Sequence, residues 1–270
     1  KDVRYWLGEL GAKSLDEIIG RTDLIEILPG ETKRQSSLDL RPIIDSDGLT
    51  KNKPRFCSTP GNDPYDKGEL AETILKETFS CIKDKTGGEF FFNISNNNRS
   101  IGAKLSGEIA RLNGGKGIPD APIDLNLQGT AGQSLGAFNV EGLNINLIGD
   151  ANDYVGKGMG GGRITIKPPE NRKFLPSETV IIGNTCLYGA TGGKLFASGQ
   201  AGERFAVRNS GAISVIEGAG DHCCEYMTDG VVVVLGPTGL NFGAGMTGGF
   251  SYVLDLDRKF VDLYNHELID

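Results

Sequence analysis

The chain has 270 residues, of which 38% are hydrophobic and 23% charged, a balance typical of a folded globular protein. A net charge of −7 without a long Lys/Arg block argues against nucleic-acid binding, and no apolar run reaches the roughly 18 residues that span a membrane. Forty glycines against 11 prolines exclude collagen-like and low-complexity chains and favour many tight backbone corners.

The first residues and the cysteines predict what kind of chain this is and in which compartment it resides. The first residues, KDVRYWLGEL, contain neither an initiator methionine nor a signal-peptide core, so we expect a piece of a longer chain. An odd number of cysteines without a CxxC pair predicts a reducing compartment, the cytoplasm, and with two histidines it disfavours a metal cage. These residues are Cys57, Cys81, Cys186, Cys223, Cys224, His222 and His266.

Residues 1–85 are predicted to be a helical and extended connector. Val3, Trp6, Leu7 and Leu10 have the spacing of one apolar helix stripe, and Ser14 begins a capping box for a second helix. The polar stretch 29–66 reads as extended, with a short helix near 36–40, and an amphipathic helix follows over 67–83. These helices share little core of their own, so we expect them to pack on another part of the parent protein.

Residues 86–270 are predicted to form short strands separated by glycines. Strands are expected at 89–95 and 123–127, with a short helix over 105–112 between them. Further on, a glycine precedes each β-rich run, and successive glycines lie 20, 31, 18, 19 and 19 residues apart. The longest step contains an apparent insertion, 168–178. These glycines are Gly142, Gly162, Gly193, Gly211, Gly230 and Gly249.

A repeat of roughly 19 residues is too short for a propeller blade or a helix-pair repeat and fits one coil of a β-solenoid. Coils of this kind cannot bury their inward residues alone, so they stack around a shared core. We therefore expect a mainly β fold of about six to seven coils. The run Val231–Leu235 is apolar on both faces of its strand, which predicts that other protein covers this coil.

Two GxGxxG sequences begin at Gly156 and Gly243. Dinucleotide binding requires this motif to follow a strand and to open a helix. Here each motif precedes a strand, at the same phase of the repeat, so solenoid corners are the favoured interpretation and cofactor binding the weaker alternative. Gly156-Lys157-Gly158 also lacks the first glycine and the Ser/Thr of a phosphate loop.

Carboxylates and thiols near the corners have catalytic and structural interpretations. The carboxylates are Asp150, Asp153, Glu217, Asp221 and Glu225; acid–base or cation-binding chemistry is possible in principle, but capping of turn donors is favoured. Cys186 is interpreted as a buried core residue rather than a nucleophile. Cys223 and Cys224 are expected on opposite faces of an extended segment, and His222 at the surface or in a turn.

Several blocks together resemble the carboxy-terminal GxGxG domain of the glutamate synthase large chain. The blocks are GTAGQSLGAF (129–138), GDANDYVGKGMGGG (149–162), IIGNTCLYGATGG (181–193), AGERFAVRNSGA (201–212), EYMT (225–228) and NFGAGMTGGFSYVL (241–254). Upstream, NRSIGAKLSGEIA (98–110) and VRYWLGELGAKSLDEIIGRTDL (3–24) extend the resemblance to nearly the whole chain.

The resemblance implies a single-stranded right-handed β-helix over 86–270, after the helical connector 1–85. It implies a parent oxidoreductase of glutamate biosynthesis and ammonia assimilation, which forms two glutamates from glutamine, 2-oxoglutarate and reductant. A glutaminase domain and a barrel with FMN and a 3Fe–4S cluster are then partners in the same chain. The electron donor is either ferredoxin or an NADPH-linked reductase subunit.

This chain is expected to brace those domains and to contribute no catalytic, cofactor-binding or metal-binding residue, so it is predicted to be inactive alone. Neither an amino-terminal nucleophilic cysteine nor a cysteine cluster for iron–sulfur ligation is present. Two alternatives stay open: a free-standing β-helix subunit like that of formylmethanofuran dehydrogenase, and a ligand-binding solenoid. The latter requires aligned exposed aromatics, whereas aromatic residues make up only 7%.

Overall fold

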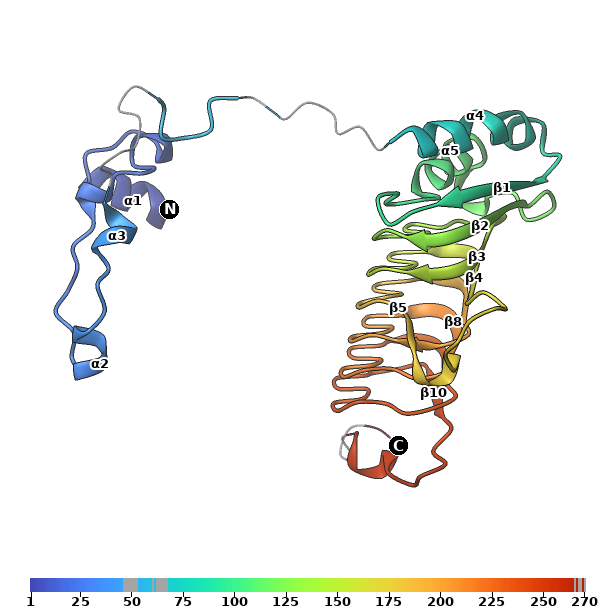
Figure 1. Ribbon diagram of the computed structural model, residues 1–270. Coiled ribbons are helices and arrows are strands. Elements are labelled where there is room, and N and C mark those ends of the chain that lie inside the picture. Colours follow the sequence, from blue (N-terminus) through green and yellow to red (C-terminus); the bar gives the residue numbers. More distant parts are fainter. Residues whose placement is uncertain (46–52, 60, 62–67, 265, 267–268, 270) are drawn as a thin grey trace. The chain divides into compact units, whose positions relative to one another are not determined.

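The computed structural model describes the chain except for residues 46–52, 60, 62–67, 265, 267–268 and 270 (Figure 1). Internal contacts divide it into two compact units, 1–65 and 66–270, which are described separately here. The division into domains at residue 85 stays a prediction about the organisation of the parent protein.

Unit 1 consists of short helices that bury nothing among its described residues. Its elements are α1 (Asp2–Glu9), η1 (Leu15–Glu17), η2 (Thr22–Leu24), α2 (Lys33–Ser36) and α3 (Arg41–Ile44). The expected apolar stripe of the first helix is present, but Trp6 on it is 63% exposed. Unit 1 therefore presents apolar surface without a core to receive it.

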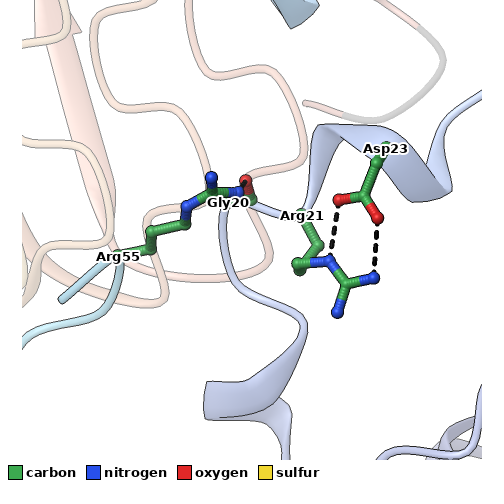
Figure 2. A network of polar contacts seen from close by, with 4 residues as sticks. All are labelled: Gly20, Arg21, Asp23 and Arg55. Atoms are coloured by element: carbon green, nitrogen blue, oxygen red, sulfur yellow. Dashed lines mark hydrogen bonds and ion pairs between the residues drawn. The ribbon is translucent and has the colours of Figure 1, made fainter. Parts of the chain in front are cut away.

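Polar contacts fix part of this unit. Figure 2 shows Arg55, whose Nη1 donates to the carbonyl of Gly20 at 2.7 Å and so joins segments 35 residues apart. Arg21 donates two hydrogen bonds to Asp23, at 2.7 and 2.6 Å, and this guanidinium lowers the pKa of the carboxyl. Both side chains are solvent-exposed, so the pair adds little stability.

The capping box expected at Ser14 is not formed. Ser14 makes no side-chain cap bond, and only the 3₁₀ turn η1 follows it. The Glu17 carboxylate accepts instead from the backbone N–H of Lys13, at 2.9 Å. A capping box does occur at Thr32 and Gln35, and the helix that it opens, α2, begins at Lys33, three residues before the expected short helix.

Unit 2 begins with two helices that pack on the first strands. α4 (Glu69–Asp84) and α5 (Ala103–Asn113) contact each other, and α4 also contacts β1 and β2. Both predicted helices are confirmed, the amphipathic one over 67–83 and the short one over 105–112: α4 buries Ile74 and Ile82, and α5 buries Leu105 and Ile109. Gly114 caps α5 at the predicted position with φ +69°, which glycine adopts readily.

All strands of unit 2 belong to one parallel sheet, in which the main order is β1-β2-β3-β4-β6-β8-β9-β10. The two remaining strands lie off this order: β5 pairs with β3 and with β7. The elements are β1 (Gly88–Ile94), η3 (Gly114–Lys116), β2 (Ile123–Ala131), β3 (Leu143–Ala151), β4 (Gly160–Lys167), η4 (Pro176–Glu178), β5 (Val180–Ile182), β6 (Gly192–Ala197), β7 (Gln200–Ala201), β8 (Ser210–Ile216), β9 (Asp229–Val234), β10 (Phe250–Val253) and η5 (Phe260–Asp262).

The register of the sheet reproduces the glycine spacing found in the sequence. Asp124 pairs with Asn144, Asn144 with Arg163, and Arg163 with Lys194, which are steps of 20, 19 and 31 residues. Lys194 pairs with Ile213, Ile213 with Val231, and Val231 with Phe250, which are steps of 19, 18 and 19 residues. The long step contains the segment predicted to be an insertion, so the repeat in sequence is a repeat in strand pairing.

The prediction of a mainly β, single-stranded right-handed β-helix was wrong. The described strands form one parallel sheet, and α4 and α5 contribute side chains to the same core, which is an α/β arrangement. The physical reason is that glycine spacing predicts only how far apart paired strands lie in sequence. It does not determine the path of the connections between strands, nor which helices join the core.

Six turn segments connect the successive strands, and they share one backbone conformation. They span 134–139, 154–159, 185–190, 204–209, 222–227 and 241–246, and in each the first, third and fifth residues have φ between +54° and +67°. In all six, the sixth N–H donates to the third carbonyl at 2.9–3.1 Å. The third residue of this β-turn is the fifth of the segment, and its positive φ favours glycine, as at Gly158 and Gly245; Gly156 and Gly243 open the two turns and also have positive φ.

The turn segments stack through backbone hydrogen bonds as the strands do. The third N–H of a segment donates to the second carbonyl of the preceding segment, from Gly156 to Leu135 at 2.9 Å through Gly243 to Cys223 at 2.7 Å. The fifth N–H donates in the other direction, to the fourth carbonyl of the next segment, as from Gly158 to Tyr188 at 2.8 Å. Each repeat is therefore hydrogen-bonded to both neighbours at its corner as well as along its strand.

The core lies between the inward faces of the strands and the turn segments. The second residue of each turn segment is buried, and the strands contribute aliphatic side chains opposite. These residues are Leu135, Val155, Cys186, Phe205, Cys223 and Phe242 from the turns, and Leu125, Ile145, Ile164, Leu195 and Val232 from the strands. The buried Asn209 side chain donates to the Ala212 carbonyl and accepts from its N–H, at 3.0 and 2.9 Å, so the polar group is satisfied.

Removal of residues 1–65 should leave a folded unit 2, because no described residue of unit 1 is buried. Removal of residues 1–85 also deletes Ile74 and Ile82 from the core, where loss of one such side chain typically costs about 2–5 kcal/mol. Thermal unfolding followed by circular dichroism should show a cooperative transition for 66–270 and a weakened or absent one for 86–270. Loss of the transition in 66–270 would contradict this account.

The same substitution at two glycines should have opposite effects on stability. Gly158→Ala places a Cβ 2.9 Å from the ring of Phe138 at φ +62°, so the free energy of unfolding should fall by about 1–2 kcal/mol. Gly107→Ala is the matched control: it lies inside α5 with nothing within 4 Å, and it should raise the free energy of unfolding by about 0.5–1 kcal/mol. Urea unfolding measures both; equal effects would show that the left-handed turn positions do not matter.

Candidate interaction surface

The corner carboxylates mostly accept hydrogen bonds within the stacked repeats. Asp153 Oδ1 accepts from the N–H of Asn184 at 2.7 Å, and Asp221 Oδ1 accepts from the N–H of Leu240 at 2.6 Å. Asp150 accepts from the hydroxyl of Thr130 at 2.9 Å, and Glu217 from that of Ser198 at 3.3 Å. Asp153 and Asp221 therefore cap backbone donors, as the favoured interpretation has it, whereas Asp150 and Glu217 bond to side-chain hydroxyls of the neighbouring repeat.

Glu225 lies in a small charged cluster on two adjacent repeats. Its Oε2 is 3.0 Å from Arg204 Nη2, and its Oε1 is 3.7 Å from His222 Nδ1. His222 is the first residue of its turn segment, as expected for a turn residue, with φ +62°. Among the described residues, no three or more His, Cys, Asp and Glu side chains are grouped so as to hold a metal ion.

The three cysteines of the repeats are buried. Burial raises the pKa of Cys186 to about 12, and its Sγ donates to the Gly183 carbonyl at 3.2 Å, so it is a protonated core residue. The expectation that Cys223 and Cys224 point to opposite faces was wrong, since both are buried with Sγ atoms 3.7 Å apart. The alternation fails because Cys224 has φ +59° and the segment is turned rather than extended.

Both GxGxxG sequences lie at the same phase of the repeat and lead into strands β4 and β10. A pyrophosphate site requires the amino terminus of a helix after the glycines, and neither motif provides one. The glycines serve the turn geometry instead: a Cβ on Gly245 would lie 2.5 Å from the Tyr226 ring of the preceding repeat.

The outward face of the sheet changes character along the stack. Its first strands carry polar ladders, in which Asn144 Nδ2 donates to Asp124 and Asn146 Nδ2 to Asn126, both at 3.0 Å. On β6 the first of these two positions is still charged, Lys194, and the second is Phe196; from β8 to β10 both positions are apolar and paired strand to strand. This set is called the outer apolar patch: Phe196, Ile213, Val215, Val231, Val233, Phe250 and Tyr252.

The outer apolar patch is partly open to solvent, with Phe250 67% and Tyr252 58% exposed. Val231 and Val233 are half-buried at its centre. The run Val231–Leu235 was expected to be apolar on both faces, and the structure places its outward valines in this larger patch. Neighbouring residues such as Phe196 and Ile213 were missed; they become visible only when the repeats are aligned strand by strand. Contiguous exposed apolar surface is typical of contact sites, so the outer apolar patch is a candidate interaction surface.

Comparison with known proteins finds similarity along the whole chain. A family model described as GXGXG motif matches residues 69–270. The whole chain is 48% identical over 273 residues to ferredoxin-dependent glutamate synthase 2 of Synechocystis sp., covering 17% of that protein. It is 49% identical over 269 residues to ferredoxin-dependent glutamate synthase of Pyropia yezoensis, with 99% of this chain and 17% of that one covered.

A third relative is named for a different reductant, NADH. Glutamate synthase [NADH] of Schizosaccharomyces pombe is 42% identical over 278 residues, which cover the whole of this chain and 13% of that protein. A chloroplastic/mitochondrial ferredoxin-dependent enzyme of Arabidopsis thaliana is 45% identical. The chain therefore spans less than a fifth of the length of these relatives. No helix in the described ranges is long and apolar enough to cross a membrane.

Thiol alkylation should separate core from surface cysteines. Iodoacetamide at pH 8 should modify exposed Cys57 quickly, and should leave Cys186, Cys223 and Cys224 unmodified because all three are buried; burial also raises the pKa of Cys186 and Cys223. Peptide mass spectrometry after timed quenching measures each site, with a denatured sample as the control in which all five react. Native Cys186 reacting at a rate like that of Cys57 would contradict a structural role.

Proposed function

The chain belongs to the GXGXG motif family, and from this membership and its relatives we propose that it is a structural domain of a glutamate synthase. The parent enzyme would form two glutamates from glutamine, 2-oxoglutarate and reductant. The domain would hold other domains of that chain in place, a glutaminase domain and an FMN-binding domain, without a catalytic residue of its own.

The outer apolar patch is the observation that carries this proposal. It lies on a sheet whose repeats are hydrogen-bonded along the strands and again at the turn segments, so the surface is presented on a stiff support. A surface that must fix the distance between two domains needs this stiffness. The carboxylates and thiols of the repeats, by contrast, are engaged in turns or buried in the core.

The cofactors of the parent are proposed to lie outside these 270 residues. A 3Fe–4S cluster requires grouped thiolates. Cys186 comes from a different turn segment than Cys223 and Cys224, and burial raises the pKa of Cys186 and Cys223. The residues present therefore do not fit this cluster. The glycine-rich segments do not fit a flavin phosphate either, because they open strands rather than helices.

Ferredoxin is the favoured electron donor of the parent, since the relatives at 48% and 49% identity are named ferredoxin-dependent. The relative named for NADH is 42% identical. A cytoplasmic location stays a prediction, and a chloroplast is the alternative that the name of the Arabidopsis thaliana relative raises.

Substitution in the outer apolar patch of the full-length parent tests the proposal. Val233→Lys would bury a charge in the domain contact and should lower glutamine-dependent glutamate formation about tenfold or more, a cost above about 1.4 kcal/mol. Thr165→Lys is the matched control, because Thr165 holds the same outward position on the polar part of the sheet. It should leave activity near the wild-type level.

A second experiment uses the isolated 270-residue chain. It should form no glutamate and show no flavin or iron–sulfur absorption. If the parent enzyme with Val233→Lys has wild-type activity, the proposal that this surface braces other domains is contradicted. Turnover or a bound chromophore in the isolated chain would overturn the proposal that its residues are not catalytic.

A further inference from the structure

Lys194 lies at the border between the polar part of the outward sheet face and the outer apolar patch. It holds the first outward position of β6, and its register partners are Arg163 on β4 and Ile213 on β8. Phe196, two residues further along β6, points to the same face and belongs to the patch. A charged side chain is thus placed next to apolar side chains on two sides.

The charges of the polar part compensate one another, whereas that of Lys194 is uncompensated. Asp124 accepts from Asn144 Nδ2 at 3.0 Å, and its Oδ1 lies 3.9 Å from Nη2 of Arg163. Arg163 therefore reaches across β3 toward the carboxylate on β2. Lys194 is exposed and takes part in no ion pair in the part of the chain that the structure describes.

The surroundings of Lys194 within the sheet do not favour a cation. Arg163 and Lys194 are paired in register, and like charges at opposite positions of two strands are destabilising. Glu217, which follows the patch residues on β8, is engaged by the hydroxyl of Ser198 at 3.3 Å. The chain as a whole has a net charge of −7, so these two neighbouring cations also run against its general charge.

Covering the outer apolar patch would bring Lys194 into the contact. Neighbouring strands are about 4.8 Å apart, so β6 lies about 10 Å from β9 at the centre of the patch. A contact of standard size covers roughly 800 Å² on each partner, a disc of about 16 Å radius. The ammonium group would then lose much of its water, and a desolvated ammonium without a counter-charge is strongly unfavourable.

We propose that the outer apolar patch binds a protein surface that has apolar side chains at its centre and, at its rim, an Asp or Glu carboxylate paired with Lys194. This inference rests on the proposed function, in which another domain of the parent chain covers the patch, and it adds the chemistry of the surface that is recognised. The apolar centre stabilises the contact, and one charge pair at the rim fixes its orientation. A phosphate-rich partner would satisfy the ammonium but leave the valines and rings unmatched.

Carbodiimide treatment of the full-length parent tests the pair, because this reagent joins an amine to a carboxylate already in contact with it and leaves no spacer. Peptide mass spectrometry should find Lys194 joined to an Asp or Glu outside these 270 residues. Acetic anhydride should modify Lys194 about tenfold more slowly in the parent than in the isolated chain. Lys173, exposed in the stretch 168–178, is the control and should react at the same rate in both.

The substitution Lys194→Glu should have different effects in the isolated chain and in the parent. In the isolated chain it gives Arg163 a neighbour of opposite charge, so the melting temperature should stay the same or rise. In the parent it sets one carboxylate against another, and glutamate formation should fall about tenfold. Lys173→Glu makes the same change of charge in another segment and should leave both quantities near wild type. Lysine in place of the cross-linked carboxylate should restore the activity of Lys194→Glu.

Rapid acetylation of Lys194 in the parent, or wild-type activity of Lys194→Glu, would overturn the carboxylate partner. A cross-link to a carboxylate within these 270 residues, in the same molecule or in a second copy, would overturn the choice of partner. Low activity of Val233→Lys together with a freely reactive Lys194 contradicts this inference alone. Full activity of Val233→Lys together with the expected cross-link contradicts the bracing function alone.

Discussion

The fold depends on backbone hydrogen bonds between turn segments that have left-handed residues at every second position. Each segment must turn the chain within six residues and still direct N–H groups at both neighbouring repeats. Positive φ at the first, third and fifth residues meets both demands. Most side chains pay a strain of about 1 kcal/mol or more for such a conformation, so glycine recurs there. The corners become as regular as the strands, and the core between them is continuous.

This constraint also explains where function can reside. Side chains at the second and sixth positions of a turn segment point into the core, where Cys186, Cys223 and Met227 are buried. Polar residues beside the turns cap neighbouring backbone groups, as Asp153 and Asp221 do. Among the described residues, the outward face of the sheet is left for contact with other protein, which agrees with a supporting part in a larger enzyme.

Much of this could be predicted from the sequence, because glycine marks the turns. The spacing of Gly142, Gly162 and Gly193 corresponds to the strand register, and the helices predicted over 67–83 and 105–112 correspond to α4 and α5. The prediction of a β-helix failed because spacing does not determine how connections run. The middle turn segments escaped notice because Leu187, Ala206 and Cys224 adopt positive φ without glycine, held there by the neighbouring repeats. The same cause misplaced Cys224.

Native-state hydrogen exchange at the third position of the turn segments tests the central role of this stacking most directly. The amides concerned belong to Gly136, Gly156, Leu187, Ala206, Cys224 and Gly243, each bonded to the repeat before it. If stacked turns hold the repeats together, the interior members should exchange as slowly as amides in β3 and β8, through global unfolding. Exchange at the rate of exposed loops, with the strand amides still protected, would show that the strands alone carry the fold and would contradict this account.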